Sequence, residues 1–484
     1  MNILFLASEA VPFAKTGGLG DVSGVLPKVL AKSEKVSLMM PDYMTENITR
    51  LQPAQIDEFP LQIGAEIYPV VIKKAEIFKN FSVFFIANER FFGREFLYGD
   101  ATGDYADNFI RFFFFQKAAL AFVVKHGLHF DIIHCNDWQT AMVPLYVKLE
   151  SRASLFSGTK TIFSIHNLGY QGIFAAEFFR QTGLPDYLFS PEGLEFYGNL
   201  NCLKAGIIFS DHVLTVSPTY AGEILLAEKG FGLDGLLKKF SFKLSGILNG
   251  VDYSLWNPAL DPFIGFRYTQ GSLEEKRKNK QKLFAELGIA RDGRSPLLVM
   301  ISRISEQKGV ELLPELLPLL LKENVHFIFL GVGDRSLTEK LKAVAARFPD
   351  SMSFLNCFDE RKAHQLEAAG DILFMPSVYE PCGLNQIYSM KYGTVPVVRA
   401  TGGLDDSVQE FDPATRQGTG FKFKGPDVEG VLAALRKALR FHADKGLWRV
   451  IQKNGMEMDF SWERTAPEYI DLYNKILVED TQHG

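Results

Sequence analysis

Residues 2–30, NILFLASEAVPFAKTGGLGDVSGVLPKVL, contain a short apolar run, a glycine-rich turn and a helical pattern, in that order. The run Asn2–Ser8 has the length and composition of a buried strand. Apolar residues then recur at helical spacing from Val22 to Leu30. Pro27 lies inside this pattern, and we expect a break there, with the regular helix beginning at Pro27. Strand, turn and helix in this order indicate one unit of an α/β fold.

The same alternation continues along the chain. Further apolar runs at Val36–Met40, Val83–Ala87, Asp131–His134, Thr161–Ile165 and His212–Val216 are separated by helical stretches such as Asp107–His126. After a polar segment, 252–280, the pattern restarts at Leu297. We therefore expect two similar α/β halves, each with a parallel sheet covered on both faces. The expected divisions are residues 1–250, a linker or start of the second domain at 251–290, residues 291–461, and a C-terminal helix within 462–484.

Composition excludes several classes of protein. The 52 Lys and Arg residues against 57 Asp and Glu give a net charge of −5, which argues against nucleic-acid binding and against a polybasic membrane-binding face. The four cysteines have no CxxC spacing, as expected of a reduced, cytoplasmic chain. The N-terminus lacks a cationic signal-peptide region, and charged residues interrupt the longest apolar stretch, 109–124.

The turn Lys15–Asp21, KTGGLGD, is the first candidate site. Its glycines allow a ligand to approach the backbone, the following helix offers its N-terminus to an anion, and Lys15 adds a positive charge. Phosphate or sugar binding and a plain tight turn both fit these features. A dinucleotide site is a further alternative, because Asp42 follows Gly20 at the distance of a ribose-binding acid. The third glycine, Gly24, is out of register for that motif, which argues against a nicotinamide enzyme.

The second half carries charged and glycine-rich loops after its apolar runs. Arg303 and Lys308 follow the first run and suit a diphosphate, although a solvated charged loop fits equally well. Glu380 and Gly383 follow the run at 371–377, where a carboxylate can accept sugar hydroxyls and amide groups can meet phosphate. Thr401–Leu404, TGGL, is a second glycine-rich segment that follows an apolar run. In parallel sheets these strand ends share one edge, which faces the ligand.

Several histidine, cysteine and aspartate residues are potential metal ligands. His126, His129, His134, Cys135 and Asp137 are close in sequence but match no zinc-binding spacing, so we expect no metal site. The pair His166–Asn167 follows an apolar run, where it is either a ligand contact or a structural turn. The sequence contains no nucleophile elbow, HExxH or Walker A motif.

Eight motifs taken together resemble the glycogen and starch synthases of bacteria and plants, glycosyltransferase family 5. They are KTGGLGDV (15–22), HCNDWQ (134–139), SIHNLGYQG (164–172), VSPTYAGEI (216–224), GILNGVD (246–252), SRISEQKG (302–309), EPCGLNQIYSMKYGTVPVV (380–398) and TGGL (401–404). The resemblance implies the GT-B architecture, with two Rossmann-like domains facing a deep cleft and the last helix returning to the first domain. It also implies transfer of glucose from ADP-glucose to the non-reducing end of an α-1,4-glucan with retention of configuration, without a cofactor.

The resemblance also assigns roles to individual residues. It implies a catalytic set of Asp137, His166, Arg303, Lys308 and Glu380. It implies donor contacts from Lys15, Gly18, Asp21, Tyr98, Asn249, Phe358, Cys382, Gly383, Leu384, Tyr388, Thr401 and Gly402. The chain departs from the usual motifs at Cys135–Asn136, at Val378–Tyr379 and at Asn385. Tyr388 stands where the related sucrose synthase group has a glutamate.

Two alternatives remain at this stage. One is another GT-B enzyme that uses UDP-glucose, and the other is a non-catalytic glucan-binding scaffold. The retained Lys15, Arg303, Lys308 and Glu380 argue against the scaffold. The expected partners are ADP-glucose and a glucan, with no nucleic acid and no membrane, and the residues give no indication of the oligomeric state.

Overall fold

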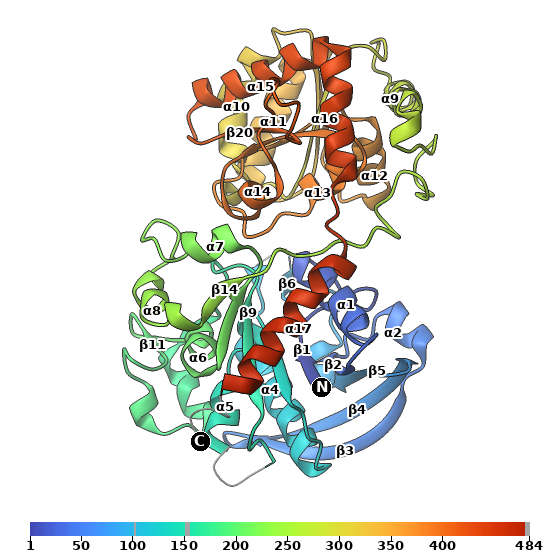
Figure 1. Ribbon diagram of the computed structural model, residues 1–484. Coiled ribbons are helices and arrows are strands. Elements are labelled where there is room, and N and C mark those ends of the chain that lie inside the picture. Colours follow the sequence, from blue (N-terminus) through green and yellow to red (C-terminus); the bar gives the residue numbers. More distant parts are fainter. Residues whose placement is uncertain (101–102, 151–154, 480–484) are drawn as a thin grey trace. The chain divides into compact units, whose positions relative to one another are not determined.

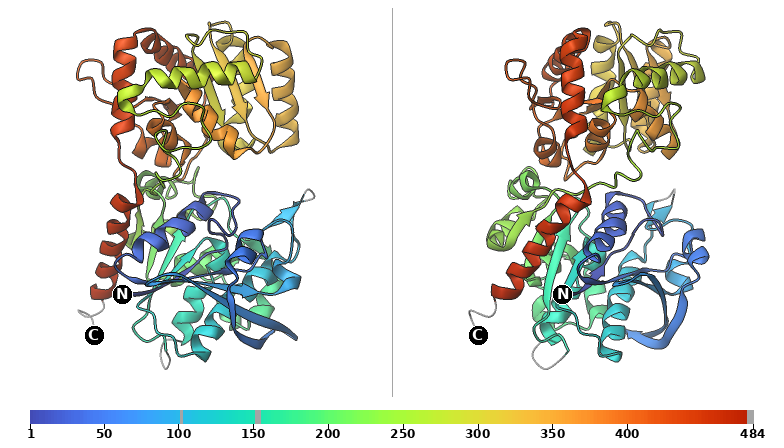
Figure 2. Two further views of the ribbon diagram at one scale, coloured as in Figure 1. Left: turned by 90° about the vertical axis from the view of Figure 1, so that its right-hand side faces the viewer. Right: turned by 45° about the vertical axis from the view of Figure 1, so that its right-hand side comes forward.

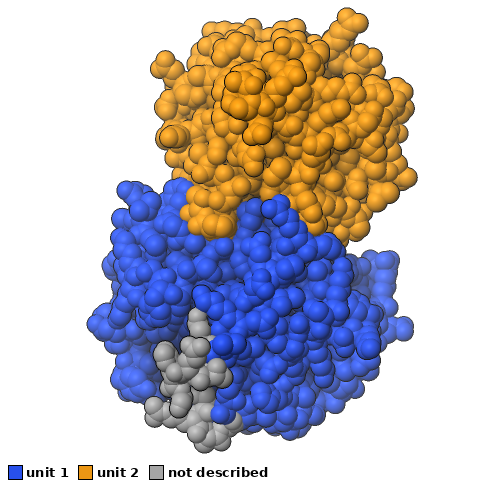
Figure 3. Space-filling model, in the orientation of Figure 1, with its two compact units in different colours: residues 1–216, 221–250, 462–484 blue, residues 217–220, 251–461 orange. Residues whose placement is uncertain are grey.

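The computed structural model describes residues 1–100, 103–150 and 155–479 (Figure 1). The chain divides into two compact units, which are coloured separately in Figure 3. The first unit comprises residues 1–216, 221–250 and 462–484, and the second comprises residues 217–220 and 251–461. Residues 480–484 of the expected C-terminal segment lie outside the described residues.

The main sheet of the first unit has nine strands. They are β1 (Asn2–Leu6), β2 (Lys35–Pro41), β3 (Ala54–Ile63), β4 (Glu66–Phe78), β5 (Phe81–Ala87), β8 (Ile132–Asn136), β9 (Lys160–Ile165), β13 (His212–Thr215) and β14 (Leu244–Gly246). Their order in the sheet is β14-β13-β9-β8-β1-β2-β5-β4-β3. Neighbouring strands from β14 to β5 all pair in parallel. Short strands form two small sheets, with β6 (Gly99–Asp100) beside β7 (Gly103–Asp104), and β10 (Ile173–Ala175) and β11 (Glu195–Phe196) on either side of β12 (Asn199–Asn201).

The expectation of a purely parallel first sheet is wrong at one edge. β4 pairs antiparallel with both β5 and β3. Exposed and buried residues alternate along much of β4 because only one face of this edge packs against the core. The sequence prediction relied on continuous apolar runs, which mark strands buried on both faces, so it missed this alternating pair.

The helices up to Gly250 and the last helix surround this sheet. They are α1 (Gly18–Leu30), α2 (Glu46–Leu51), α3 (Glu89–Phe92), α4 (Asn108–Lys125), α5 (Val143–Glu150), α6 (Cys202–Phe209), α8 (Asp234–Lys239) and α17 (Trp462–Glu479). The short helix α7 (Pro218–Glu223) begins in residues 217–220, which belong to the second unit. The C-terminal helix α17 lies beside α1, and an ion pair of 2.8 Å joins Lys32 Nζ to Glu463 Oε1 (Figure 2).

The expected break at Pro27, with the regular helix beginning there, is wrong. Helix α1 begins at Gly18 and continues through Pro27, whose side chain is buried. Proline removes one backbone donor from a helix interior. Burial of Leu19, Val22 and Leu26 on the same helix outweighs that loss.

The second unit is a six-stranded parallel sheet with helices on both faces. Its strands are β15 (Leu297–Ile301), β16 (His326–Leu330), β17 (Met352–Leu355), β18 (Ile372–Met375), β19 (Val395–Arg399) and β20 (Phe421–Phe423), in the order β17-β16-β15-β18-β19-β20. Its helices are α9 (Glu274–Glu286), α10 (Leu313–Leu320), α11 (Arg335–Arg347), α12 (Glu360–Ala369), α13 (Asn385–Lys391), α14 (Gly402–Ser407), α15 (Val428–Ala443) and α16 (Lys445–Glu457).

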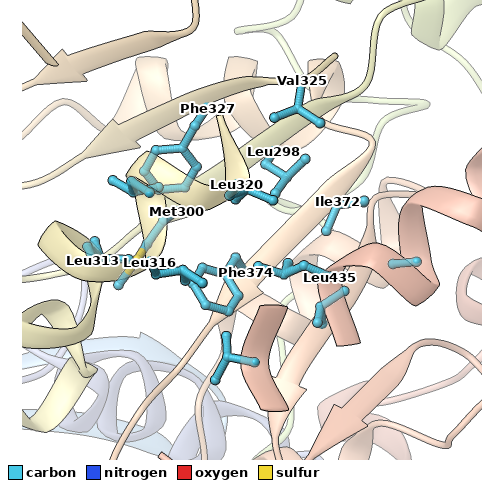
Figure 4. Close-up of a cluster of buried hydrophobic side chains, with 14 of the residues drawn as sticks. Leu298, Met300, Leu313, Leu316, Leu320, Val325, Phe327, Ile372, Phe374 and Leu435 are labelled. Carbon is cyan, nitrogen blue, oxygen red and sulfur yellow. The ribbon is translucent and has the colours of Figure 1, made fainter. Parts of the chain in front are cut away.

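Alternation along β15 divides the core of the second unit into two layers. Leu298 and Met300 pack with side chains of α10, α11, α15 and α16 (Figure 4). Leu297 and Val299 point to the opposite face and pack with α9, α12 and α14. Every residue from Leu297 to Met300 is therefore buried, which explains the continuous apolar run in the sequence.

Each sheet has a position where its strand order reverses. In the first unit the reversal lies between β1 and β8, and in the second it lies between β15 and β18. Loops after the strands on either side of such a point diverge and leave room for a ligand. Among the described residues, no helix is both long enough and apolar enough to cross a membrane.

Candidate active site

The loop after β1 is organised around a buried carboxylate that the sequence analysis did not select. Glu9 is 4% exposed, and its Oε2 accepts hydrogen bonds from Thr16 N at 2.5 Å and Gly17 N at 3.1 Å. Burial raises the pKa of Glu9, and the backbone donors act in the opposite direction. Two amide groups of the glycine-rich turn therefore face an internal anion.

Lys15 and Asp21 lie on the outer side of this turn. Lys15 Nζ and Asp21 Oδ1 form an ion pair of 2.7 Å with both side chains partly exposed. Gly18 is the first residue of α1, so the glycine-rich turn leads directly into the N-terminus of this helix. A Cβ on Gly20 would lie 3.0 Å from Lys15 Cγ and 3.1 Å from Glu9 Oε2, so the bare glycine lets both side chains pass.

Tyr98 reaches the same carboxylate from a different loop. Its hydroxyl donates to Glu9 Oε1 at 3.1 Å and lies 2.7 Å from Ser8 Oγ. Burial raises the pKa of Tyr98 well above its usual value, so the hydroxyl keeps its proton. A hollow of about 480 Å³ opens beside these loops, and Lys15, Thr16 and Tyr98 are among its lining residues.

The loops after β8 and β9 bring Asp137 and His166 together. Asp137 has a left-handed φ of 55°, and its Oδ1 accepts a hydrogen bond from His166 N at 2.7 Å. Burial raises the pKa of Asp137 to about 7, against the opposing effect of the backbone donors His166 and Asn167. A non-glycine residue with a φ of 55° and a ψ of −178° indicates local strain, which is concentrated at functional sites.

The ring of His166 is held by Asn136, which the sequence analysis noted only as a departure. Asn136 Nδ2 donates to Leu6 O at 2.9 Å, and this contact turns its Oδ1 toward His166 Nε2, also at 2.9 Å. His166 therefore carries its proton on Nε2. Burial lowers the pKa of His166 to about 3, so the ring is neutral at physiological pH.

Asn249 follows β14 and is 5% exposed. Among the described residues, no donor lies within hydrogen-bonding distance of its buried Oδ1. Buried polar atoms are normally paired, so this oxygen is a candidate for contact with a bound molecule.

In the second unit, the loops after β15 and β18 meet in an ion pair. Lys308 Nζ donates to Glu380 Oε2 at 2.6 Å, and Ser377 Oγ donates to the same oxygen at 2.9 Å. Both charged side chains are largely buried. Lys308 lies in the short 3₁₀ helix η6 (Glu306–Lys308), which places its amine beside the loop of Glu380. The structure thus joins two residues that the sequence analysis assigned to different parts of a nucleotide sugar.

The glycine-rich loops 380–384 and 401–404 pack backbone against backbone. Gly403 N donates to the carbonyl oxygen of Glu380 at 3.0 Å. A Cβ on Gly402 would lie 2.0 Å from that same oxygen, and one on Gly403 would lie 2.2 Å from the carbonyl oxygen of Cys382. Thr401 and Cys382 are buried, while Gly383 adopts a φ of 70° immediately before Leu384 and α13.

The remaining predicted residues are not drawn into these contacts. Arg303 lies in an exposed part of the loop after β15. Phe358 is 88% exposed between β17 and α12. Tyr388 is buried and stacks on Trp256 with a centroid separation of 4.0 Å. The catalytic and donor-binding roles assigned to all of the predicted site residues remain predictions.

Residues in the described ranges form no group of three or more His, Cys, Asp and Glu side chains that could hold a metal ion. The first unit contributes polar side chains held by backbone donors, and the second unit contributes a lysine–glutamate pair. Glu9 and Asn136 were missed because they act through Tyr98 and His166, which are distant in sequence. Ser377 was missed because its contact with the nearby Glu380 depends on how the loop after β18 folds. An acid placed directly between a buried strand and a glycine-rich turn was the one local signal for Glu9.

Comparison with known proteins gives matches along nearly the whole chain. Residues 2–239 match the family described as starch synthase catalytic domain, and residues 280–453 match glycosyl transferases group 1. A glycogen synthase from Anaeromyxobacter sp. is 44% identical over 98% of this chain and 99% of its own length. A glycogen synthase from Thermotoga maritima is 42% identical over 99% of both chains. The catalytic domain of starch synthase IV from Arabidopsis thaliana, bound to ADP and acarbose, is 35% identical over 99% of both chains, with a TM-score of 0.89.

Proposed function

Because the chain belongs to the starch synthase family of glycosyltransferases, we propose that it transfers glucose from ADP-glucose to the non-reducing end of an α-1,4-glucan with retention of configuration. The glycogen synthases to which it is similar, and the ADP bound to the similar plant enzyme, support this choice of substrates.

The observation that carries the proposal is the Lys308–Glu380 pair at the point where the second sheet reverses. Cleavage of the bond between sugar and phosphate moves negative charge onto the departing diphosphate. Lys308 and Arg303 supply positive charge to neutralise it, and fixed charges of this kind are effective because they need no reorganisation during reaction. Glu380 holds Lys308 through one oxygen, and a carboxylate retains further acceptor sites for sugar hydroxyls.

Residues of the first unit suit the transferred glucose. Neutral His166 and the carboxyl group of Asp137 are partly buried, and the Oδ1 of Asn249, which has no donor among the described residues, is buried. All three offer polar contacts. Such contacts orient the sugar and exclude water. The acceptor hydroxyl then approaches from the face that the diphosphate leaves, and the departing phosphate takes its proton.

A donor competition tests this function. ADP-glucose and UDP-glucose are supplied together with a maltooligosaccharide acceptor, and both nucleoside diphosphates are measured as they are released. We expect ADP release to dominate and to match glucose incorporation. Equal use of both donors, or a preference for UDP-glucose, would instead identify a different GT-B transferase.

A further inference from the structure

Glu9 has no role in the reaction outlined above, yet its carboxylate accepts hydrogen bonds from two loops of the first unit. Its two oxygens accept from Thr16 N, Gly17 N, the hydroxyl of Thr16 and the hydroxyl of Tyr98. A carboxylate that is 4% exposed and so fully bonded is fixed in position.

These bonds connect two separate loops. Thr16 and Gly17 belong to the loop between β1 and α1, whereas Tyr98 belongs to the segment between α3 and α4. The second segment is itself anchored, because Asn108 Nδ2 donates to Tyr98 O at 2.8 Å. Lys15, Thr16 and Tyr98 all line the hollow of about 480 Å³, so Glu9 lies behind its two walls and ties them together.

The same carboxylate constrains Lys15. The side-chain stem of Lys15 and Oε2 of Glu9 both occupy the space that a Cβ on Gly20 would need. The two residues that follow Lys15, Thr16 and Gly17, donate their backbone amides to Glu9. These hydrogen bonds fix the backbone next to Lys15. Its amine is directed outward to Asp21 rather than inward to Glu9.

We propose that Glu9 is a positioning residue for glucose transfer, which holds the Lys15 loop and Tyr98 in one arrangement around the donor sugar. This proposal rests on the proposed function. Glu9 itself does not contact the substrate. A glycine-rich turn between a strand and a helix often binds an anion through its backbone amides. Here the Glu9 carboxylate accepts hydrogen bonds from two of those amides from inside the protein. The turn therefore presents the Lys15 side chain to the donor.

Substitutions at Glu9 should differ in a graded way. Glu9→Ala removes the acceptor and leaves two amide groups and two hydroxyls to find other partners. Glu9→Gln keeps one oxygen for the amides, and the hydroxyls of Thr16 and Tyr98 can rotate to accept from the new NH₂ group. Glu9→Asp keeps the charge but shortens the side chain, so it cannot reach both loops.

The test measures kcat/KM for ADP-glucose in these variants with and without Lys15→Ala. A displacement of about 1 Å in a positioned group can cost on the order of 100-fold. We expect about that loss for Glu9→Ala, and recovery to within roughly tenfold of the unsubstituted enzyme for Glu9→Gln. In the Lys15→Ala background the cost of Glu9→Ala should fall below roughly tenfold, because the group it positions is already absent. If Glu9→Ala does not fold, Glu9→Asp takes its place, with an expected loss of at least roughly tenfold at an unchanged melting temperature.

Asp211→Ala is the matched control. Asp211 Oδ2 accepts hydrogen bonds from Thr161 N at 2.7 Å and from the Thr161 hydroxyl at 2.8 Å. Glu9 bonds to Thr16 in the same way, but Asp211 does not lie beside the hollow. It should lose stability but keep kcat/KM. Equal losses for Glu9→Ala in both backgrounds, or a loss no larger than that of Asp211→Ala, would overturn the proposal.

Amide hydrogen exchange gives a readout that does not depend on transfer. Thr16 and Gly17 should exchange slowly in the unsubstituted protein and in Glu9→Gln, and quickly in Glu9→Ala. Unchanged exchange in Glu9→Ala would contradict the role of Glu9 even in a chain that lacks synthase activity. If the amides exchange as expected in all three proteins but the unsubstituted protein transfers no glucose, the proposed function is contradicted and the role of Glu9 in holding the loop is not.

Discussion

At the scale of single residues, Lys308 and Arg303 differ in their surroundings although they share one proposed task. Lys308 is bonded to the buried Glu380, whereas Arg303 lies in an exposed stretch of loop. Removing Lys308 therefore leaves the buried Glu380 carboxylate without its cation, with the Ser377 hydroxyl still bonded to it, and an uncompensated buried charge is costly. Removal of Lys308 should therefore destabilise the folded protein more than removal of Arg303.

We predict that Arg303→Ala lowers the single-turnover rate at saturating donor by about 10²–10³-fold, with a smaller effect on donor affinity. Lys308→Ala should reduce the rate similarly and, unlike Arg303→Ala, should also lower the melting temperature. The double variant should lose less than the product of the two, since both residues serve one charge. Calorimetric donor affinities complete the comparison. An Arg303→Ala enzyme that binds donor weakly but reacts at the normal rate would show that Arg303 acts only in binding.

Asp137 gives a prediction about pH. Its pKa is about 7 in the folded protein against 3.8 for an ordinary aspartate, so the folded state keeps a proton that the unfolded chain releases between these values. Stability from this group is present at low pH and is lost as the pH rises toward 7. Asp137→Asn removes the effect. The variant's unfolding free energy relative to the unsubstituted protein should rise by at most about 1.4 kcal/mol per pH unit across the window and then level off.

Denaturant unfolding at pH 5, 6, 7 and 8 measures this difference, and glucose transfer by Asp137→Asn should be impaired throughout. Asparagine has the same shape as aspartate, so the substitution adds no strain to that already present at this φ of 55° and ψ of −178°. A stability difference that stays constant with pH would show that Asp137 is not the buried acid described here.

At the scale of elements, the two glycine-rich loops of the second unit depend on the absence of side chains. We predict that Gly403→Ala lowers both the melting temperature and kcat/KM, the latter by about 100-fold, because its Cβ would lie 2.2 Å from the carbonyl oxygen of Cys382. Gly271→Ala is the control in the same unit, since its Cβ would meet Thr269 Oγ1 at an ordinary 3.6 Å. Normal kinetics for Gly403→Ala would mean that the contact between these loops does not shape the site.

The elements also show what the sequence could and could not predict. Strands buried on both faces, such as β1 and β15, stand out as apolar runs, and the charged loops after them could be assigned to a site. The β3–β4 pair was missed because its burial alternates, and the break at Pro27 was wrong because core packing outweighed local preference. Asn136 acts through His166 on another loop, so no local pattern indicated it. Glu9 acts through Tyr98 as well as its own loop, and its position after the first strand was the one local signal for it.

At the scale of the whole molecule, the last helix belongs to the first unit although the chain reaches it from the second. Tyr473 on α17 places its hydroxyl 2.7 Å from His134 Nδ1, and His134 Nε2 lies 2.6 Å from Ser164 Oγ. These contacts lie on β8 and β9, whose ends carry Asp137 and His166. The C-terminal helix therefore supports the strands that position the site.

We predict that Tyr473→Phe lowers the unfolding free energy by about 1–3 kcal/mol, because a buried ring nitrogen of His134 loses its partner. Trp462 is 2% exposed against Gly250, and Trp462→Ala should cost about 3–5 kcal/mol. Val478→Ala, on the exposed side of the same helix, should change stability by no more than about 0.5 kcal/mol. Equal effects from all three substitutions would contradict the packing described for α17.

The central claim is that the chain extends an α-1,4-glucan by transfer from ADP-glucose. The most direct measurement incubates the purified chain with ADP-glucose carrying ¹³C in the glucose and with maltotetraose, and follows the anomeric signals by NMR. We expect a new labelled α-1,4-linked glucose at the non-reducing end and one ADP released for each glucose transferred. Release of free labelled glucose without elongation, or a labelled β-linkage in the product, would contradict it.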